Sequence, residues 1–292
     1  MHGDVAPIDA LAPLVDGCYA DPLVTVGAHR ASPGEPAVRT EHFDVTFTGG
    51  GLLVTHAVPP WAVDDNLAGM LNNQLFGPGW LRGSDLFERV FTGVVRTSLE
   101  DALTAWELFY RNTTAALAGR ARRDPGTIRD YGPVQDHALD LLAGDSALEL
   151  GCRFGFLSLR VAGTGRATTA SDMSPGTVRL LDAMAPLLGV RLGTVTADAA
   201  RFPAGDGLAD TVLAVHLLEH LDADHGAQVL AEAIRLAVRR VVVAVPLETE
   251  PDEAFGHVRT VSLDDLHRWG RASGRPFDVH ELHGGWLVID VG

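Results

Sequence analysis

The most informative stretch of the chain reads Ala147-Leu148-Glu149-Leu150-Gly151-Cys152-Arg153-Phe154-Gly155. It predicts a short apolar strand that enters a turn with two glycines and is followed at once by an apolar helix. A second expected strand, 167–171, ends at Asp172, which follows Gly151 by 21 residues. A glycine turn with an acid about 20 residues later is typical of sites that hold a ribose through its hydroxyls. Gly151, Gly155, Asp172 and the adjacent Met173 are therefore candidate ligand-binding residues.

Two classes of cofactor use this layout, and the residues of the turn separate them. A dinucleotide site needs G-x-G-x-x-G, but Arg153 and Phe156 stand where the second and third glycines belong. Glu149, at the end of the first strand, would repel a phosphate and suits an ammonium group. The ligand indicated is a nucleoside that carries an amino acid. The alternative is an ordinary strand–turn–helix with a surface acid and no ligand.

The pattern Leu-Glu-Leu-Gly-x-x-x-Gly resembles the first motif of class I S-adenosylmethionine-dependent methyltransferases. The chain departs from that motif at Arg153, because most such enzymes carry a middle glycine there. The resemblance implies that S-adenosylmethionine is the cofactor and that Glu149, Gly151, Gly155 and Asp172 contribute to its binding.

Composition bears on the partners that the protein can have. Acidic residues outnumber basic ones by 38 to 23, for a formal net charge of −15. Phosphate binding needs concentrated positive charge, so we expect no nucleic-acid partner. No apolar run is long enough to span a bilayer, no signal peptide is visible, and two cysteines do not suggest a disulfide framework. We therefore expect a cytoplasmic protein without a membrane partner.

The composition and pattern of the chain divide it into three parts. Residues 1–37 carry five prolines among small residues, which predicts an irregular arm. Residues 38–125 predict a hairpin over 43–55 and a helical cover whose helices begin at Ser84 and Ser98. Residues 126–292 predict alternating strands and helices, which would form the S-adenosylmethionine-binding domain.

Seven strands are expected in this third part. Besides the two described above, strand patterns lie at 193–197, 211–216, 240–245, 277–282 and 286–291. The last two flank a glycine turn and predict an antiparallel pair. Alternating strands and helices predict an α/β sheet covered by helices on both faces. The seven strands with a closing hairpin resemble the Rossmann-like methyltransferase sheet and differ from a six-stranded dinucleotide fold.

Asp198 and Ala199 follow the third of these strands. Ligands of open α/β sheets bind at the carboxyl ends of strands, so Asp198 is a candidate to accept from the exocyclic amine of adenine, with Ala199 offering its backbone N–H. The alternative is a helix cap. This segment also resembles the adenine-reading segment of the class I methyltransferases.

A cluster of histidines follows the fourth strand, in Val215-His216-Leu217-Leu218-Glu219-His220-Leu221. It resembles a segment of methyltransferases related to the ubiquinone-biosynthesis enzymes and to the small-RNA 2′-O-methyltransferases, in which an acid-x-x-Glu-His pattern can hold a divalent metal.

Three interpretations of the histidine cluster stay open. It is a hydrogen-bonded pair without function, a metal site of His216, Glu219 and His220 that holds Mg²⁺ or Mn²⁺, or a catalytic base at His220 with His216 against the methionine part of the cofactor. His257, in a later loop, resembles the second active-site histidine of the family.

The segment from Asp65 to Trp80 looks like that of methyltransferases assigned to the mycofactocin oligosaccharide. That resemblance implies O-methylation of a carbohydrate hydroxyl, with a small soluble glycan as the partner. Aromatic and amide side chains suited to sugar binding occur over residues 61–82, at Trp61, Asn72, Asn73, Gln74, Phe76 and Trp80. The amides have an equally simple alternative role, which is to satisfy backbone groups of a buried loop. From another functional class, the alternative is a non-catalytic methyltransferase-like domain that binds a nucleoside or a partner protein.

Overall fold

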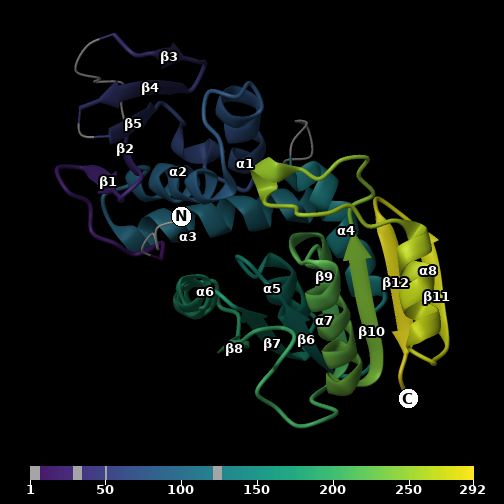
Figure 1. Cartoon of the computed structure of the whole chain (residues 1–292). Helices are drawn as coiled ribbons and strands as arrows, with labels where there is room; N and C mark the ends of the chain where they lie inside the picture. The colour runs from purple at the N-terminus through teal and green to yellow at the C-terminus, as the bar shows by residue number, and fades with distance from the viewer. Residues whose placement is uncertain (1–6, 29–34, 50, 121–126) are drawn as a thin grey trace. The chain divides into compact units, whose positions relative to one another are not determined.

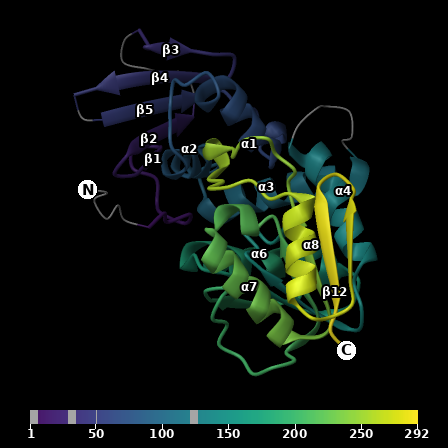
Figure 2. The same cartoon turned by 45° about the vertical axis from the view of Figure 1, so that its right-hand side comes forward.

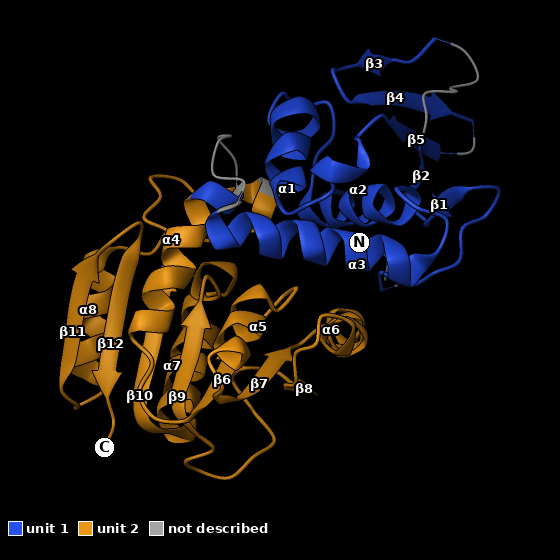
Figure 3. Cartoon of the chain, turned by 180° about the vertical axis from the view of Figure 1, so that it is seen from behind, with its two compact units in different colours: residues 1–129 blue, residues 130–292 orange. Residues whose placement is uncertain are grey.

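The computed structural model describes residues 7–28, 35–49, 51–120 and 127–292 (Figure 1). The chain forms two compact units, residues 1–129 and 130–292 (Figure 3). The domain boundary predicted between 125 and 126 falls on residues 121–126, outside the described ones. The two units are described separately below.

The first unit contains a five-stranded sheet in the order β1-β2-β5-β4-β3. The predicted hairpin is confirmed, since β4 and β5 pair antiparallel. The strands are β1 (Cys18–Ala20), β2 (Val24–Ala28), β3 (Val38–Arg39), β4 (Phe43–Thr48) and β5 (Gly51–His56).

The prediction of an irregular arm over 1–37 is wrong for residues 18–28. These residues form β1 and β2, and β2 pairs parallel with β5. Tyr19, Val24 and Val26 are buried, so burial of alternate apolar side chains stabilises this segment as strand. Pro22 lies between the two strands, where its missing N–H costs no ladder hydrogen bond.

The helices of the first unit follow its strands. They are η1 (Pro60–Ala62), α1 (Asn66–Leu71), the π-helical turn η2 (Asn72–Phe76), α2 (Ser84–Thr97), α3 (Ala102–Ala115) and the π-helical turn η3 (Ala116–Arg120). Helix α2 packs against β2 and buries the apolar residues Phe87, Val90, Phe91, Val94 and Val95.

Helix α2 begins at Ser84, as predicted, whereas the start predicted at Ser98 is wrong by a few residues. The residue before α2 is Gly83, at φ 93°, and no side chain caps this helix. Helix α3 is capped by Asp101, whose Oδ1 accepts from the Thr104 N–H at 2.8 Å. Ser98, the predicted cap, instead donates its hydroxyl to the Val95 carbonyl, at the end of the preceding helix.

The second unit is built on a seven-stranded sheet in the order β11-β12-β10-β9-β6-β7-β8. Its strands are β6 (Ser146–Leu150), β7 (Ala167–Asp172), β8 (Gly193–Thr196), β9 (Ala209–Val215), β10 (Ala237–Val245), β11 (Phe277–Glu281) and β12 (Gly285–Asp290). The neighbours from β8 to β10 are parallel, whereas β12 is antiparallel to both β10 and β11. The predicted seven-stranded α/β sheet with a closing antiparallel pair is confirmed.

Helices cover both faces of this sheet. They are α4 (Thr127–Asp140), which begins at the end of the first unit, α5 (Phe156–Gly163), α6 (Pro175–Leu187), η4 (Leu218–His220), α7 (Ala223–Leu236), η5 (Glu253–Phe255) and α8 (Leu263–Ala272). Leu148 and Leu150 of β6 belong to the core under α7 and α8, whereas Ala147 belongs to the core under α4 and α5. Helix α8 lies against β11 and β12 (Figure 2). Alternate side chains of β6 therefore face opposite layers of helices.

Candidate active site

Four candidate residues lie at or just after the carboxyl ends of neighbouring parallel strands. Gly151 follows β6, Asp198 follows β8, His216 follows β9, and Asp172 is the last residue of β7. The strand registers align these ends, because Leu150 pairs with Ser171 and Asp172 pairs with Thr196. The topology of the sheet therefore gathers these residues at one edge, where ligands of open α/β sheets bind.

The turn after β6 requires both of its glycines. Gly151 and Gly155 have φ of 70° and 74°, a left-handed backbone that strains residues with a Cβ. A Cβ on Gly151 would also lie 2.6 Å from Cδ1 of Leu217, and one on Gly155 would lie 2.4 Å from Cδ2 of Leu181. The glycines are thus needed to pack the turn against these two leucines, in addition to any close approach of a ligand.

Glu149 lies in β6, directly beneath this turn. Its side chain is 5% exposed, and Oε2 accepts a hydrogen bond from the hydroxyl of Ser158 in α5. Burial raises the pKa of this carboxyl to about 7, against the opposing effect of the Ser158 hydrogen bond. A buried carboxyl of this kind gains its negative charge most readily when a cation arrives. Its contact with an ammonium group of the cofactor stays a prediction.

Asp172 ties the glycine turn to the start of α6. Its Oδ2 accepts from the backbone N–H of Arg153 at 3.0 Å, and its Oδ1 accepts from the N–H of Ser174 at 2.9 Å. Each carboxylate oxygen can accept a further hydrogen bond, so the ribose hydroxyls of a nucleoside remain suitable partners. The next side chain, Met173, is 70% exposed and offers an apolar contact beside this acid.

Asp198 caps a turn, so the alternative interpretation as a helix cap is wrong. Its Oδ1 accepts from the N–H of Ala200 at 2.9 Å and lies 3.0 Å from Nε2 of His225. The same two side chains line an open groove. The backbone hydrogen bond, followed by the one from His225, lowers the pKa of Asp198, so the carboxylate is charged at neutral pH. Its role with Ala199 in reading adenine stays a prediction.

His216 has a strained backbone and a buried, neutral ring. Its φ is 53°, and its Nε2 has no hydrogen-bond partner among the described residues. The ring packs edge-on against Tyr131 of α4, with 4.7 Å between ring centroids. Burial, then the nearby His257 and His220, lower its pKa to about 3. Nδ1 lies 3.5 Å from Oε1 of Glu219, but a neutral imidazole forms no ion pair there.

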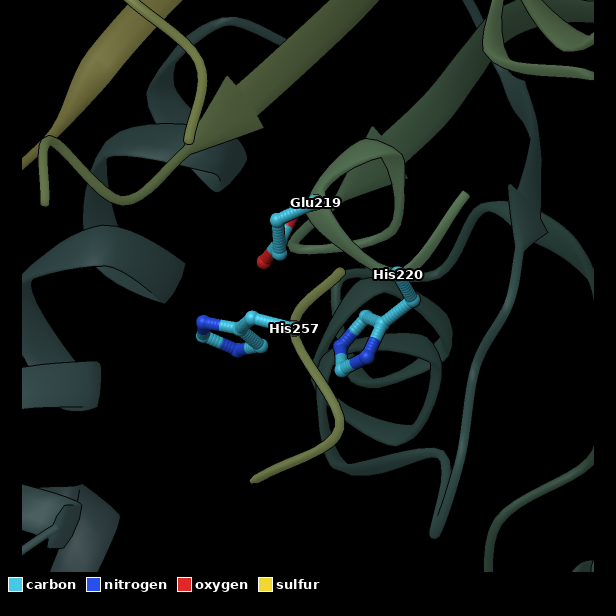
Figure 4. Close-up of side chains that lie close together, drawn as sticks. All are labelled: Glu219, His220 and His257. Carbon is cyan, nitrogen blue, oxygen red and sulfur yellow. The ribbon is translucent and has the colours of Figure 1, made fainter. Parts of the chain in front are cut away.

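Glu219, His220 and His257 converge at this edge (Figure 4). The first two lie in η4, directly after β9, and His257 lies in the loop after β10. The N–H of Val258 donates to the Glu219 carbonyl at 2.9 Å, which fixes this loop against η4. The two imidazole rings meet edge to face at 4.9 Å between centroids. His257, not the predicted His216, therefore joins Glu219 and His220 in the cluster that could hold a metal.

Hydrogen bonds orient both imidazole rings of the cluster. Nδ1 of His257 lies 2.8 Å from Oε2 of Glu248, and Nδ1 of His220 lies 3.3 Å from the Gly256 carbonyl. Carbonyl and carboxylate oxygens accept hydrogen bonds, so each Nδ1 carries the proton and each Nε2 keeps its lone pair. Partial burial of His220, then the nearby His257, lower the pKa of His220 to about 4, so this imidazole is neutral at pH 7.

Glu219 gives the cluster its capacity for a cation. Its side chain is 1% exposed, and neither carboxylate oxygen has a hydrogen-bond partner among the described residues. Burial raises its pKa to about 8. A buried carboxylate needs a compensating charge, and one ligand atom from each of Glu219, His220 and His257 lies within 4.8 Å of the others. The donor set therefore fits a divalent cation.

Two polar partners in this region could not be predicted from sequence patterns. Glu248 lies in an acidic stretch whose composition is typical of a solvated loop, yet it orients His257. Ser158 lies in an apolar stretch that indicates only a buried helix, yet it is hydrogen-bonded to Glu149. Both contacts join residues that are neighbours only in the folded chain, nine positions apart in each case.

Comparison with known proteins identifies the class of the second unit. Residues 147–239 match the family model described as a methyltransferase domain. A search of curated proteins gave no match. The second unit therefore contains a methyltransferase domain, carried by the seven-stranded sheet.

Several solved structures are similar to this chain. A magnesium protoporphyrin IX methyltransferase from Synechocystis PCC 6803, solved with bound SAH, is 17% identical, with a TM-score of 0.47 over 61% of this chain and 94% of its own. A SAM-dependent methyltransferase from Aquifex aeolicus is 14% identical, with a TM-score of 0.48 over 61% of this chain and 98% of its own. No helix in the described part of the chain is long and apolar enough to cross a membrane.

Proposed function

We propose that this methyltransferase transfers the methyl group of S-adenosylmethionine to a hydroxyl oxygen of a neutral carbohydrate, with the mycofactocin oligosaccharide as the specific candidate. The observation that carries the proposal is the cluster of His220 and His257, whose Nε2 atoms keep their lone pairs at the edge of the sheet where the cofactor residues gather. The resemblance of residues 65–80 to the mycofactocin methyltransferases supports the choice of acceptor.

Methyl transfer requires that the acceptor oxygen be aligned with the methyl carbon and that a nearby group accept the hydroxyl proton. The acceptor oxygen attacks the methyl carbon as the bond from that carbon to the sulfonium sulfur breaks, and sulfur keeps the bonding electrons as a thioether. The hydroxyl proton must leave, and neutral His220 can take it on Nε2. His257, whose ring is oriented by Glu248, would help to position the acceptor hydroxyl beside His220. Removal of either ring should therefore slow the chemical step.

A divalent metal on Glu219, His220 and His257 is the alternative role of the same cluster. When bound there, it would supply Lewis-acid polarisation of the acceptor hydroxyl. Two imidazoles and one carboxylate suit Mn²⁺ or Zn²⁺ better than Mg²⁺, which prefers oxygen ligands. Chelator treatment followed by addition of single metals separates the two roles. Full activity after exhaustive chelation supports the metal-free base, whereas loss of activity with recovery in Mn²⁺, Zn²⁺ or Mg²⁺ supports the metal.

Exposed aromatic side chains in the first unit support a carbohydrate acceptor. Trp61 is 77% exposed and Trp80 is 55% exposed, and sugars bind to such flat apolar faces. Two other predicted sugar contacts have internal roles instead. Gln74 accepts from the Thr40 hydroxyl and the His42 N–H, and Phe76 packs edge-on against Phe87. We therefore restrict the aromatic sugar contacts to the two tryptophans.

The acceptor class is tested by transfer of a labelled methyl group. The enzyme with methyl-labelled S-adenosylmethionine is offered neutral glucose oligosaccharides, RNA, or phospholipid vesicles in separate reactions. We expect label only in the oligosaccharide, and label in RNA or lipid would overturn the carbohydrate proposal. Trp80→Ala should raise KM for the oligosaccharide without changing cofactor affinity. Phe47→Ala, at an exposed aromatic residue of β4, is the matched control and should leave KM unchanged.

A further inference from the structure

Arg153 departs from the glycine pattern in the turn that binds the cofactor. Its φ is 49°, and the two glycines that flank it in the turn, Gly151 and Gly155, have φ of 70° and 74°. A left-handed backbone disfavours every residue that has a Cβ, so glycine would be easier to accommodate at this position. Strained residues of this kind cluster at functional sites. The strained backbone therefore indicates that the arginine side chain has a function at this position.

The guanidinium of Arg153 is available for a ligand. The residue is exposed, and no ion pair or side-chain hydrogen bond involves its guanidinium among the described residues. Its Cζ lies 5.0 Å from the centroid of the Phe154 ring. An aromatic face holds a guanidinium in place and leaves its N–H groups free to donate at the edges.

The backbone of Arg153 is tied to the acid that is predicted to hold the ribose. Its backbone N–H donates to Oδ2 of Asp172, the acid predicted to hold the ribose. In S-adenosylmethionine, the sulfur joins the ribose, the transferable methyl group and the amino-acid chain. A residue held at the ribose acid, in the turn that follows Glu149, is therefore placed to meet the amino-acid part.

We propose that Arg153 binds the α-carboxylate of S-adenosylmethionine. A guanidinium presents paired N–H donors that match the two oxygens of a carboxylate. Glu149, beneath the same turn, offers the opposite charge to the ammonium group. The turn would thus recognise both charges of the amino-acid part, and Arg153 replaces the middle glycine for this purpose.

The proposal is tested with S-adenosylmethionine and decarboxylated S-adenosylmethionine, which lacks only the α-carboxylate. Calorimetry with the full chain should show that the wild type prefers the complete cofactor by about 10- to 100-fold, as expected for hydrogen bonds between charged groups. Arg153→Gly should lose this preference by binding the complete cofactor more weakly, with unchanged affinity for the decarboxylated form. Arg191→Gly, in the loop after α6, is the matched control and should keep the wild-type preference.

The variants also keep the test independent of folding and of the acceptor. Glycine suits a φ of 49°, so Arg153→Gly should melt no lower than the wild type, and Arg153→Lys, which keeps the charge, should keep part of the preference. A wild-type preference in Arg153→Gly would overturn the proposal. So would a change confined to KM for the acceptor, because the carboxylate would then belong to that substrate. The binding measurement needs no acceptor, so it stands or falls separately from the carbohydrate proposal.

Discussion

Nδ1 of His257 lies 2.8 Å from Oε2 of Glu248, across a loop that returns to the end of β9. This hydrogen bond fixes the tautomer of His257 and directs Nε2 away from Glu248. The position of the ring beside His220 therefore depends on a carboxylate that need not touch the substrate.

We expect Glu248→Gln to reduce kcat by about 10- to 100-fold, the usual loss when a residue that orients a functional histidine is changed. The amide can present its NH₂ group in place of an acceptor, and it carries no charge to stabilise an imidazolium. Cofactor affinity should stay the same. Glu250→Gln, in the exposed part of the same loop, is the control. Equal turnover in Glu248→Gln and the wild type would contradict this role.

Removal of the proposed base gives a second prediction. His220→Ala should lower kcat by about 10²- to 10⁴-fold, because positioned bases typically contribute this much. Calorimetry should still show cofactor binding with wild-type affinity. His283→Asn, at an exposed turn position with φ 54°, controls for the loss of a histidine, since asparagine tolerates that backbone. A variant that binds no cofactor would place His220 in binding and not in the chemical step.

Cofactor binding should release a proton from Glu149 near neutral pH. The pKa of this carboxyl is about 7 in the free protein, and an ammonium group beside it would lower that value. The proton must leave before the ion pair forms, so affinity should rise as pH increases from about 6 to 8. Calorimetry in buffers of different ionisation enthalpy measures the released proton. Glu149→Gln should remove the release that belongs to this site, and an unchanged pH dependence in this variant would contradict the assignment.

Glu219 should make the free protein less stable at alkaline pH. Its folded pKa of about 8 exceeds its usual value of 4.5, so between these values the folded state binds more protons than the unfolded state. The stability that the protonated group contributes is therefore lost as pH rises through 8. Between pH 7 and 8 the unfolding free energy should fall by up to about 1.4 kcal/mol per pH unit from this group. Denaturant titrations should find a smaller slope for Glu219→Gln, and an equal slope would contradict the protonated carboxyl.

Much of the second unit could be predicted because its signals are local. Apolar periodicity predicts the strand that enters the turn at 147–155 and the helix that follows it, and the two glycines, which permit a positive φ, predict the turn itself. Once the strands are parallel, register brings residues after their carboxyl ends to one edge, so Gly151 and Asp172 could be paired from spacing alone. The geometry of a parallel sheet alone places these two residues close together.

The features that could not be predicted depend on contacts between distant parts of the sequence. The pairing of β2 with β5 comes from packing across the first unit, which a proline-rich composition at 1–37 conceals. His257 joins Glu219 because a loop folds back onto η4, and no local pattern specifies that return. Glu248 likewise has the composition of a solvated loop, and only the folded chain shows that it orients a histidine.

The central claim is that the cofactor methyl group is transferred to a hydroxyl oxygen at the histidine cluster. The most direct test is NMR of the product formed from ¹³C-methyl S-adenosylmethionine and neutral glucose oligosaccharides, with the wild type and with the double variant His220→Ala/His257→Ala. We predict a labelled methyl ether on a sugar oxygen with the wild type, and none with the double variant that still binds cofactor. Label on nitrogen, sulfur or carbon, or an equal yield of methyl ether from the double variant, would contradict the account.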